Sequence, residues 1–175
     1  MLFRSGEIEF DIKASGDWTR GLAAVKEGSA ARLHGPFGAF TLEGVEPASP
    51  LLLVAGGIGI TPFLAVVREL AAAGSRRDVR LVWSVGAAPD AFARDELEGL
   101  ASRLPNLQAT VWVTHGPGGK GWLDAAAFAS LLDAADLEWT EVFLCGPPQF
   151  MAAMTRTLLG MGLPEARLHA ERFGY

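Results

Sequence analysis

Hydrophobic positions divide most of the chain into strand-like and helix-like segments. From Pro50 onward, largely apolar runs of strand length alternate with segments in which apolar residues recur at helical spacing. This alternation is typical of a parallel β-sheet whose strands are joined by crossover helices, and continuous apolar runs are typical of strands buried on both faces. The pattern predicts strands at residues 51–55, 80–85, 109–114, 141–145 and 167–172.

The segments between these strands carry helical periodicity. In the first of them, apolar residues recur from Phe63 to Leu70, and Gly74 then ends the pattern. The predicted helices cover residues 63–70, 92–104, 128–132 and 150–161. The fold class indicated by this order is α/β.

The residues before Pro50 follow a different pattern. Ile8, Phe10 and Ile12 alternate with polar residues, as in a half-solvated antiparallel strand. Strands at residues 8–12 and 30–33, a short helix from Thr19 and a polar linker at residues 43–49 are predicted here. So few elements cannot form an independent β-domain, which needs a closed or doubly layered sheet. We therefore expect a partial antiparallel domain with its linker over residues 1–47 and an α/β domain over residues 48–175.

Composition and charge disfavour several function classes. The chain has 175 residues, of which 50% are hydrophobic and 20% charged, which is within the ordinary globular range. Its net charge is −5 and it has no basic block, so nucleic acid and anionic membrane surfaces are not expected partners. Cys145 is the single cysteine, and the N-terminal MLFRSGEIEF lacks the apolar stretch of a signal peptide. A reducing, cytoplasmic location is expected.

One segment has the length of a short membrane span. The stretch from Pro50 to Val67 is uncharged, which is close to the shortest length that crosses a bilayer. Three glycines and Pro62 interrupt its centre, and these residues disfavour a helix. We expect no membrane span in this chain.

The segment LLLVAGGIGITPF is the strongest candidate for ligand binding. In it an apolar strand runs into Gly56, Gly57 and Gly59. Glycines let the backbone approach a ligand closely, and a following helix offers free N–H groups, so a pyrophosphate is the expected ligand. Thr61 suits the N-cap of that helix and Pro62 its first position. The alternative is a tight strand-to-helix turn without a ligand, and the loop is neither GxGxxG nor a lysine-bearing P-loop.

A second candidate lies in EVFLCGPPQF. Cys145 stands at the carboxyl end of a predicted parallel strand, the edge at which open α/β sheets bind ligands. Gly146 and Pro147 begin the turn that follows. The alternative is that Cys145 is a small buried hydrophobic residue.

GGIGITP followed by CGPP in a domain of this kind resembles the ferredoxin-NADP reductase superfamily, which includes phthalate-dioxygenase-type reductases and the cytoplasmic part of bacterial ferric reductases and NADPH-oxidase-like proteins. The resemblance covers nearly the whole chain. It implies a NAD(P)-binding domain of the ferredoxin-reductase type, preceded by a partial antiparallel β flavin-binding barrel. It implies contacts with the nucleotide pyrophosphate for Gly56, Gly57, Gly59, Ile60 and Thr61. It also places Cys145 beside the nicotinamide, with Gly146 and Pro147 shaping the floor of the site.

The N-terminal part carries two more matching segments. SGDWTRGL resembles the family's GxxS/T segment, which would place Gly16, Asp17, Trp18 and Thr19 against the FAD pyrophosphate. The alternative is a plain N-cap before a helix. ARLHGPFGAF resembles the segment that closes the flavin barrel, and His34 there is expected to be structural.

The C-terminal HAERFGY is similar to the family's last strand, which brings a glutamate and an aromatic residue toward the flavin and nicotinamide. Glu171 and Phe173 are the matching candidates, with Tyr175 as a second aromatic. An aromatic ring at this position can stack on the flavin ring and must move aside for nicotinamide. The alternative is an ordinary edge strand with a frayed tail.

The chain departs from the family pattern in two places. No RxYS/T segment, which normally holds the flavin, precedes Gly6. After the second strand the family often carries an arginine for the adenosine phosphate, whereas this chain has Ser84 and then Gly86. Ser84 can bond a ribose hydroxyl or a 2′-phosphate, so both NADH and NADPH remain open, and Arg94 is a further basic candidate.

The remaining candidates carry little signal. His115 and His169 have no cysteine or carboxylate at metal-ligand spacing, so no metal site is assigned. Lys120 in HGPGGKGW is interpreted as part of a solvated loop, with contact to a nucleotide phosphate as the alternative.

The sequence therefore supports one main hypothesis, a flavin-dependent reductase. Hydride would pass from NAD(P)H to FAD, and electrons would go on to ferric iron, haem or an iron-sulfur protein. DWTRGL and HGPFGAF look most like the ferric-reductase and NADPH-oxidase branch of the family. By analogy, the chain is expected to be cytoplasmic, and either a fragment of, or a homologue shortened from, a protein with an N-terminal membrane portion, whose haem domain would be one acceptor. The rival hypothesis is a truncated, non-catalytic module that binds a nucleotide or a partner without flavin. A flavin-free dehydrogenase is disfavoured because no acid/base pair accompanies the glycine loop.

Overall fold

A computed structural model describes residues 8–35, 40–132 and 134–172 of the chain. The chain divides into two compact units, Met1–Ala39 and Phe40–Tyr175. In the first unit, residues 8–35 contain α1 (Asp17–Gly21) and the single turn η1 (Leu22–Ala24). The strands expected at residues 8–12 and 30–33 do not form in this described segment. A strand persists only when another strand pairs with it, and two short strands alone are marginal in water.

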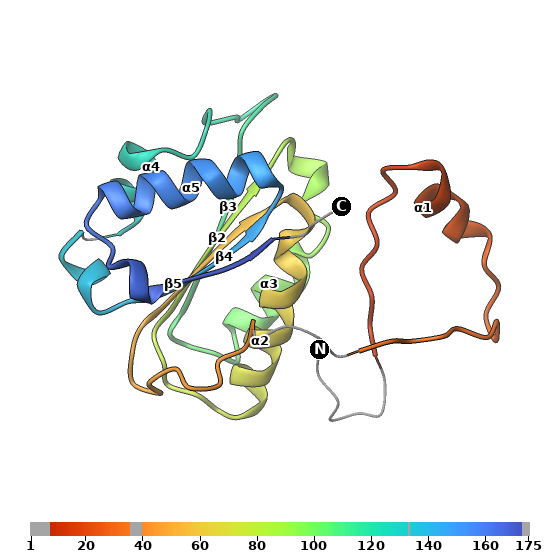
Figure 1. Ribbon diagram of the computed structural model, residues 1–175, viewed down its shortest axis with the longest axis horizontal. Helices are drawn as coiled ribbons and strands as arrows, with labels where there is room; N and C mark the ends of the chain where they lie inside the picture. Colours follow the sequence, from red (N-terminus) through yellow and green to blue (C-terminus); the bar gives the residue numbers. More distant parts are fainter. Residues whose placement is uncertain (1–7, 36–39, 133, 173–175) are drawn as a thin grey trace. The chain divides into compact units, whose positions relative to one another are not determined.

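The second unit is built on a five-stranded parallel sheet (Figure 1). Its strands are β1 (Leu51–Gly56), β2 (Val79–Val85), β3 (Leu107–Val113), β4 (Glu141–Gly146) and β5 (Leu168–Arg172). Their order in the sheet is β3-β2-β1-β4-β5, and every neighbouring pair is parallel. The five strands and the α/β class expected from the apolar runs are confirmed.

Helices cover both faces of this sheet (Figure 1). The four long helices are α2 (Thr61–Ala72), α3 (Arg94–Ala101), α4 (Ala125–Leu131) and α5 (Pro148–Gly160). Short 3₁₀ turns lie at η2 (Gly57–Ile60), η3 (Ala88–Asp90), η4 (Ala134–Glu138) and η5 (Glu165–Arg167). Connections between parallel strands are right-handed, so the direction in which the chain moves across the sheet decides which face a helix covers. From β1 to β2 to β3 the chain moves toward one side edge of the sheet, which puts α2 and α3 on one face. From β3 to β4 to β5 it moves toward the other side edge, which puts α4 and α5 on the opposite face.

Each face has its own hydrophobic core. Along β1 the side chains alternate, so that Leu51 and Leu53 pack with α2 and α3, whereas Leu52 and Val54 pack with α4 and α5. All four are essentially inaccessible to solvent. The continuous apolar run in the sequence therefore reflects burial on both faces, as expected for a central parallel strand.

The segment before β1 belongs to the second unit rather than to a linker. The Phe40 ring lies 5.7 Å from the Phe63 ring and 5.3 Å from the Phe143 ring, measured between centroids. The Arg77 guanidinium donates hydrogen bonds to the backbone oxygens of Ser49, at 2.6 Å, and Glu46, at 2.9 Å. The second unit thus begins at Phe40, earlier than the boundary expected at residue 48.

Candidate functional site

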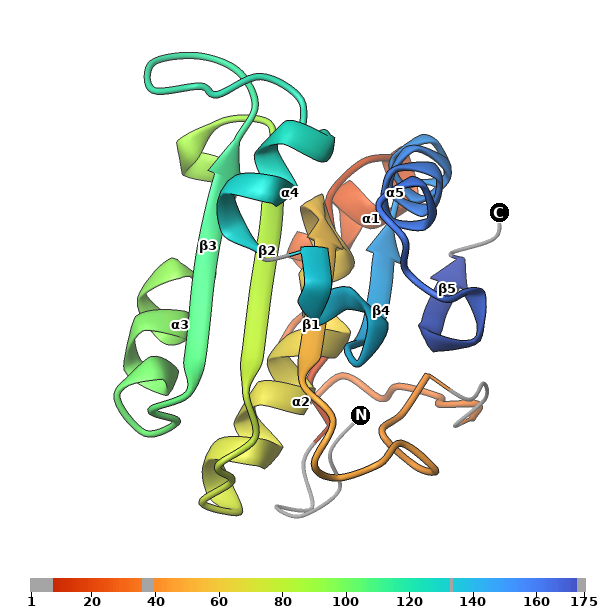
Figure 2. The same ribbon diagram turned by 90° about the vertical axis from the view of Figure 1, so that its left-hand side faces the viewer.

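The strand order creates one topological switch point, between β1 and β4. The loop after β1 leads to α2 on one face, and the loop after β4 leads to α5 on the other face. In Figure 2 the arrowheads of the parallel strands point to the same edge, where these loops lie. Open α/β sheets bind their ligands outside the carboxyl ends of the strands at such a point. The two motifs singled out in the sequence, at Gly56–Thr61 and Cys145–Pro147, meet here.

The two loops are in direct contact, and three glycines make that contact possible. A Cβ on Gly59 would collide with the Cys145 carbonyl group, 2.6 Å from its carbon. A Cβ on Gly146 would lie 3.1 Å from the Gly56 Cα, and one on Gly56 would lie 2.6 Å from a Phe150 ring carbon. Gly59 and Gly146 are therefore explained by close packing between the loops, and Gly56 by its packing on the Phe150 ring of α5. Gly57 differs, because its φ is +54° and the space around it is open.

The side chain of Trp83 in β2 is hydrogen bonded to the glycine loop. Its indole Nε1 donates a hydrogen bond of 2.8 Å to the Gly57 carbonyl oxygen, and the side chain is fully buried. Its ring packs edge to face on Phe92 at a centroid distance of 5.5 Å. Sequence reasoning missed this residue. The sequence did contain a signal, namely a tryptophan near the end of a strand predicted to be buried. Because a buried indole N–H needs an acceptor, such a residue is expected to bond a neighbouring loop.

The start of α2 differs from the expectation for Thr61. Thr61 is the first helical residue, with φ −58° and ψ −45°, and no side chain caps the helix. The reason is that the η2 turn runs directly into α2, so the backbone is already helical at Ile60. The N-cap assignment of Thr61 is wrong, and Pro62 stands one position further into the helix than expected. The N–H groups without helical partners are then those at the start of η2, around Gly57.

Cys145 and Glu171 lie side by side on adjacent strands. They are register partners in the β4–β5 pair, and Cys145 is completely buried while Glu171 is partly exposed. Burial, and to a smaller extent the nearby Glu171 carboxylate, raises the pKa of the Cys145 thiol to about 12. A neutral, buried thiol is a poor nucleophile.

The remaining candidates on this edge differ in accessibility. Ser84 is the register partner of Gly56 and Trp112 and is nearly buried, at 8% exposure. The Ile60 side chain lies in the core, so only its backbone can face a ligand. Pro147 is exposed and precedes α5 as its N-cap residue. Phe173 and Tyr175 lie outside the described residues.

The candidates in the first unit form a local turn. The Thr19 hydroxyl accepts hydrogen bonds from the backbone N–H groups of Ser15 (3.0 Å) and Gly16 (2.9 Å) and donates one to the Gly16 carbonyl (3.0 Å). Trp18 is 75% exposed, and Asp17 forms an exposed ion pair with Arg20 at 3.6 Å. Thr19 is the third residue of α1, and its hydroxyl stabilises the start of this helix by accepting from the N–H of the N-cap residue Gly16, as the N3 side chain of a capping box does.

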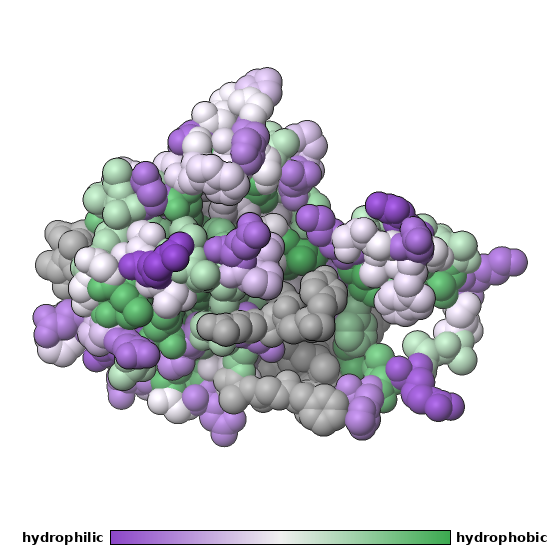
Figure 3. Space-filling model, turned by 45° about the horizontal axis from the view of Figure 1, so that its top comes forward, coloured by the Kyte–Doolittle hydropathy of each residue, from purple (hydrophilic) through white to green (hydrophobic). Residues whose placement is uncertain are grey.

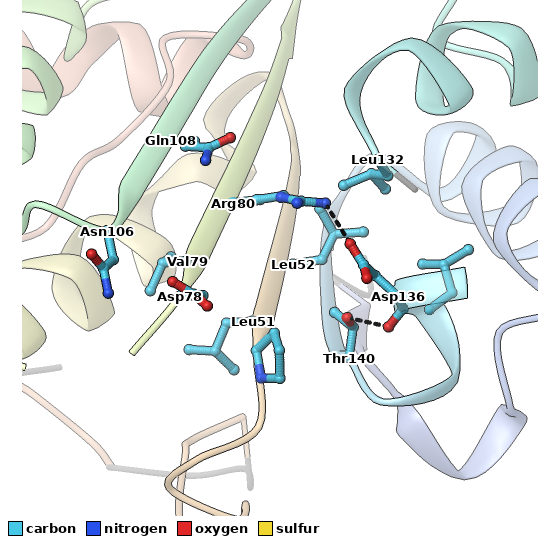
Figure 4. A pocket seen from close by; sticks show the side chains of 12 residues that line it. Leu51, Leu52, Asp78, Val79, Arg80, Asn106, Gln108, Leu132, Asp136 and Thr140 are labelled. Atoms are coloured by element: carbon cyan, nitrogen blue, oxygen red, sulfur yellow. Dashed lines mark hydrogen bonds and ion pairs between the residues drawn. The ribbon is translucent and has the colours of Figure 1, made fainter. Parts of the chain in front are cut away.

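A separate hollow lies at the opposite, amino edge of the sheet (Figure 4). Four of its polar side chains take part in hydrogen bonds or an ion pair. Arg80 pairs with the Asp136 carboxylate at 3.4 Å, and the Thr140 hydroxyl donates to the Asp136 carbonyl at 2.7 Å. The Asn106 side chain donates to the Arg76 carbonyl at 2.6 Å. This hollow does not include any residue predicted as functional from the sequence.

None of the helices in residues 8–35, 40–132 and 134–172 combines the length and apolar character needed to cross a membrane. Within the same ranges, no three His, Cys, Asp or Glu side chains converge as a metal site would require.

The chain is similar to known proteins over a range that includes both loops. The family described as the oxidoreductase NAD-binding domain matches residues 53–156, a range that includes both contacting loops. The electron transfer component of toluate 1,2-dioxygenase from Pseudomonas putida is 30% identical over 178 residues, which cover 98% of this chain and 52% of that protein. The chain spans about half the length of the curated relatives it matches.

Solved structures give the same fold. A flavohemoglobin from Malassezia yamatoensis with bound FAD and heme is 36% identical with a TM-score of 0.71, over 79% of this chain and 36% of that one. The cytochrome b5 reductase domain of Ulva prolifera nitrate reductase has a TM-score of 0.77 at 24% identity, over 89% of this chain and 64% of that one. The second similarity concerns the fold alone.

Proposed function

This chain belongs to the oxidoreductase NAD-binding domain family within the ferredoxin-NADP reductase superfamily, and from that premise we propose that it binds NAD(P)H across the carboxyl edge of the sheet and serves a flavin-dependent reductase. The observation that carries the proposal is the contact between the β1 and β4 loops at the single switch point. Both sequence motifs converge there, although they lie far apart in the chain.

The residues at this point fit a dinucleotide. Gly57 has open space beside a left-handed backbone, so a phosphate can approach its N–H closely. The η2 turn and α2 direct their amino-terminal N–H groups and positive dipole end toward the same space. We assign the pyrophosphate to Gly57 and the backbone of Ile60 and Thr61, while Gly56 and Gly59 allow the loops to pack.

The nicotinamide end belongs at the β4 loop. Gly146 and Pro147 would form the floor of its site, and Cys145 would set the depth of that floor from within the core. Because the Cys145 pKa is raised to about 12, the thiol stays neutral and gives no charge to repel or attract a hydride donor. Glu171 and Phe173 are proposed to lie beside the reacting rings, and Ser84 beside the adenosine ribose.

FAD, when bound, would accept hydride from the nicotinamide and release electrons one at a time. In this chain, Gly16, Trp18 and Thr19 are the residues proposed to contact it. The Thr19 hydroxyl orders the backbone around Gly16 through hydrogen bonds with its N–H and carbonyl groups. The acceptor we propose is a haem or iron-sulfur protein, because one relative serves a dioxygenase and a similar structure carries heme.

The test is an anaerobic titration of the purified chain with FAD and then with NADH or NADPH, followed through the visible absorbance of oxidised flavin. Bleaching of bound flavin by one nucleotide supports a reductase. A colourless protein that binds the nucleotide and not FAD would instead support the rival hypothesis of a nucleotide-binding module. Failure to bind any nicotinamide nucleotide would refute the proposal itself.

A further inference from the structure

β3 forms one side edge of the sheet, and its sequence does not protect that edge. In the described part of the chain β3 pairs with β2 alone, so its other side carries no strand (Figure 2). Proteins usually protect an open strand with a charged side chain, a proline or a bulge. β3 reads LQATVWV, without a charged residue or a proline, and pairs with β2 residue for residue. By contrast, β5 at the other side edge carries His169, Glu171 and Arg172.

The backbone groups of β3 alternate between β2 and the open side. The Asn106 carbonyl accepts from the Val79 N–H at 3.1 Å, and the Thr114 N–H donates to the Val85 carbonyl at 2.9 Å. Even-numbered residues of β3 therefore bond to β2. Since the N–H and C=O of one strand residue point to the same side, the odd-numbered residues turn theirs toward the open side. These residues are Leu107, Ala109, Val111 and Val113.

Two of the groups on the open side are already used, one at each end of the strand. The Leu107 N–H donates to the turn before β3 at 2.9 Å, and the Val113 carbonyl accepts from the loop after β3 at 2.8 Å. The Leu107 carbonyl, the Val113 N–H and both groups of Ala109 and Val111 form no hydrogen bond within the described chain. Donors and acceptors are equal in number among these open groups, so the strand is complementary to itself.

A second copy of β3 in antiparallel orientation matches these groups about a twofold axis at Thr110. Ala109 then lies opposite Val111 of the second copy, and the two residues exchange both of their hydrogen bonds. The Val113 N–H reaches the Leu107 carbonyl of the second copy, which is the one bond of that pair whose groups are still open. An axis at Ala109 would instead set the used Leu107 N–H against the open Val111 carbonyl. The axis at Thr110 therefore gives every open group a partner.

α3 adds complementary charges beside this strand. Arg94 and Glu98 of α3 line a hollow together with Ala109 and Val111 of β3. Both charged side chains are exposed, and neither forms an ion pair within the described chain. α3 returns from the end of β2 to the start of β3, so it runs antiparallel to β3. The twofold axis consequently brings Arg94 of one copy toward Glu98 of the other.

The loop after β3 limits this surface at the carboxyl end of the strand. In Figure 3 the uppermost projection, which is this loop and also stands highest in Figure 1, carries mostly pale and purple residues. Residues 115–121 read HGPGGKG, so Pro117 is the only apolar side chain among them. A polar loop of this kind belongs to the solvated rim of a contact surface, which places the second copy along β3 and α3.

We propose that two copies of this chain associate through β3, which pairs with its counterpart in antiparallel orientation about a twofold axis at Thr110. The two sheets then form one continuous sheet, and each copy presents the same surface to the other, as a twofold axis requires. Thr110 lies opposite itself, a threonine pair that favours strand association. This inference goes beyond the proposed function, because it concerns assembly and not the binding of a nucleotide.

Sedimentation equilibrium of the intact chain, at concentrations up to the millimolar range, measures this association. We expect a reversible equilibrium between monomer and dimer. Ala109→Pro removes an N–H on the open side without removing a bond to β2, so the strand can form as an edge strand. This variant should weaken the dimer about tenfold or more, because one hydrogen bond is lost in each half of the interface. A chain that is monomeric at every concentration would overturn the proposal.

Charge reversals test the position of the twofold axis through exposed side chains alone, so they do not depend on the folding of Ala109→Pro. Arg94→Glu and Glu98→Arg should each weaken the dimer severalfold, because like charges then meet across the axis. The double variant restores opposite charges and should recover the dimer. Arg156→Glu makes the same change in charge on the exposed side of α5 and should have no effect. If the two reversals behave like Arg156→Glu, or if folded Ala109→Pro dimerises as tightly as the unmodified chain, the pairing through β3 is refuted.

Discussion

The two edges of the sheet use polar groups in opposite ways. At the amino edge, side chains pair with one another, as Arg80 does with Asp136 and as Glu141 does with Arg167 and His169. At the carboxyl edge, the β1 and β4 loops meet through glycine backbone, and the N–H groups at the start of η2 are not needed by the helix. The Lys120 and His115 side chains stand on this second edge.

This difference separates residues that stabilise the fold from residues that remain available for a ligand. A polar group that is already hydrogen bonded to its neighbours contributes little free energy to ligand binding. An unpaired N–H or ammonium group contributes more, because the ligand supplies its missing partner. Three substitutions and one alkylation reaction test this division. They are given in order from the largest expected effect to the smallest.

The largest effect is expected where the two loops touch. Gly59→Ala places a methyl group against the Cys145 carbonyl, so one of the backbones must shift. We expect a loss of about 2–3 kcal/mol in the free energy of unfolding, together with weakened nucleotide binding. Urea unfolding followed by circular dichroism measures the first effect, and titration with 5′-AMP measures the second.

Gly99 provides the control for this substitution. It is exposed in the middle of α3, and a Cβ there would meet nothing within 4 Å. Gly99→Ala should stabilise the chain by about 0.5–1 kcal/mol, because alanine is the better helix former. A similar response of Gly59 and Gly99 to alanine would contradict the packing role assigned to Gly59.

Cys145 should resist modification throughout the neutral range. Its raised pKa means that the folded chain keeps the thiol proton at a pH where the unfolded chain loses it. The stabilising contribution is therefore complete below the ordinary thiol pKa of about 9 and declines as the pH rises toward 12. Iodoacetamide at pH 8 should react at least ~100-fold more slowly with the native chain than with the chain in urea. Rapid native alkylation would show that the thiol is accessible.

The apolar pattern predicted the sheet well because burial on both faces leaves a continuous signal in each strand. Its prediction of strands at residues 8–12 and 30–33 was wrong, since the alternation around Phe10 encodes only a propensity and pairing depends on a partner strand. It also misplaced Thr61, because the η2 turn before α2 carries no side-chain signal in GGIGI. Cys145 and Glu171 were both predicted, but their adjacency follows from strand order, which the sequence leaves open.

At the amino edge, the largest single contribution is expected from Glu141. Its carboxylate accepts hydrogen bonds from Arg167 at 2.6 Å and His169 at 2.8 Å and is only 13% exposed. Glu141→Gln should cost about 1–3 kcal/mol, since one partner remains charged and loses its counterion. Glu165→Gln removes an exposed carboxylate nearby and should change stability by less than about 0.5 kcal/mol. Equal effects of the two substitutions would argue against the Glu141 network.

The smallest effect is expected at the hollow in Figure 4. Asp136 is 54% exposed and its partner Arg80 is 35% exposed, so solvent screens their attraction at 3.4 Å. Asp136→Asn should lower the free energy of unfolding by less than about 1 kcal/mol and retain the backbone carbonyl that Thr140 uses. Nucleotide affinity should not change, because the hollow lies at the opposite end of the strands from the glycine loop. A severalfold change in that affinity would assign the hollow a part in binding and would end the distinction between the two edges.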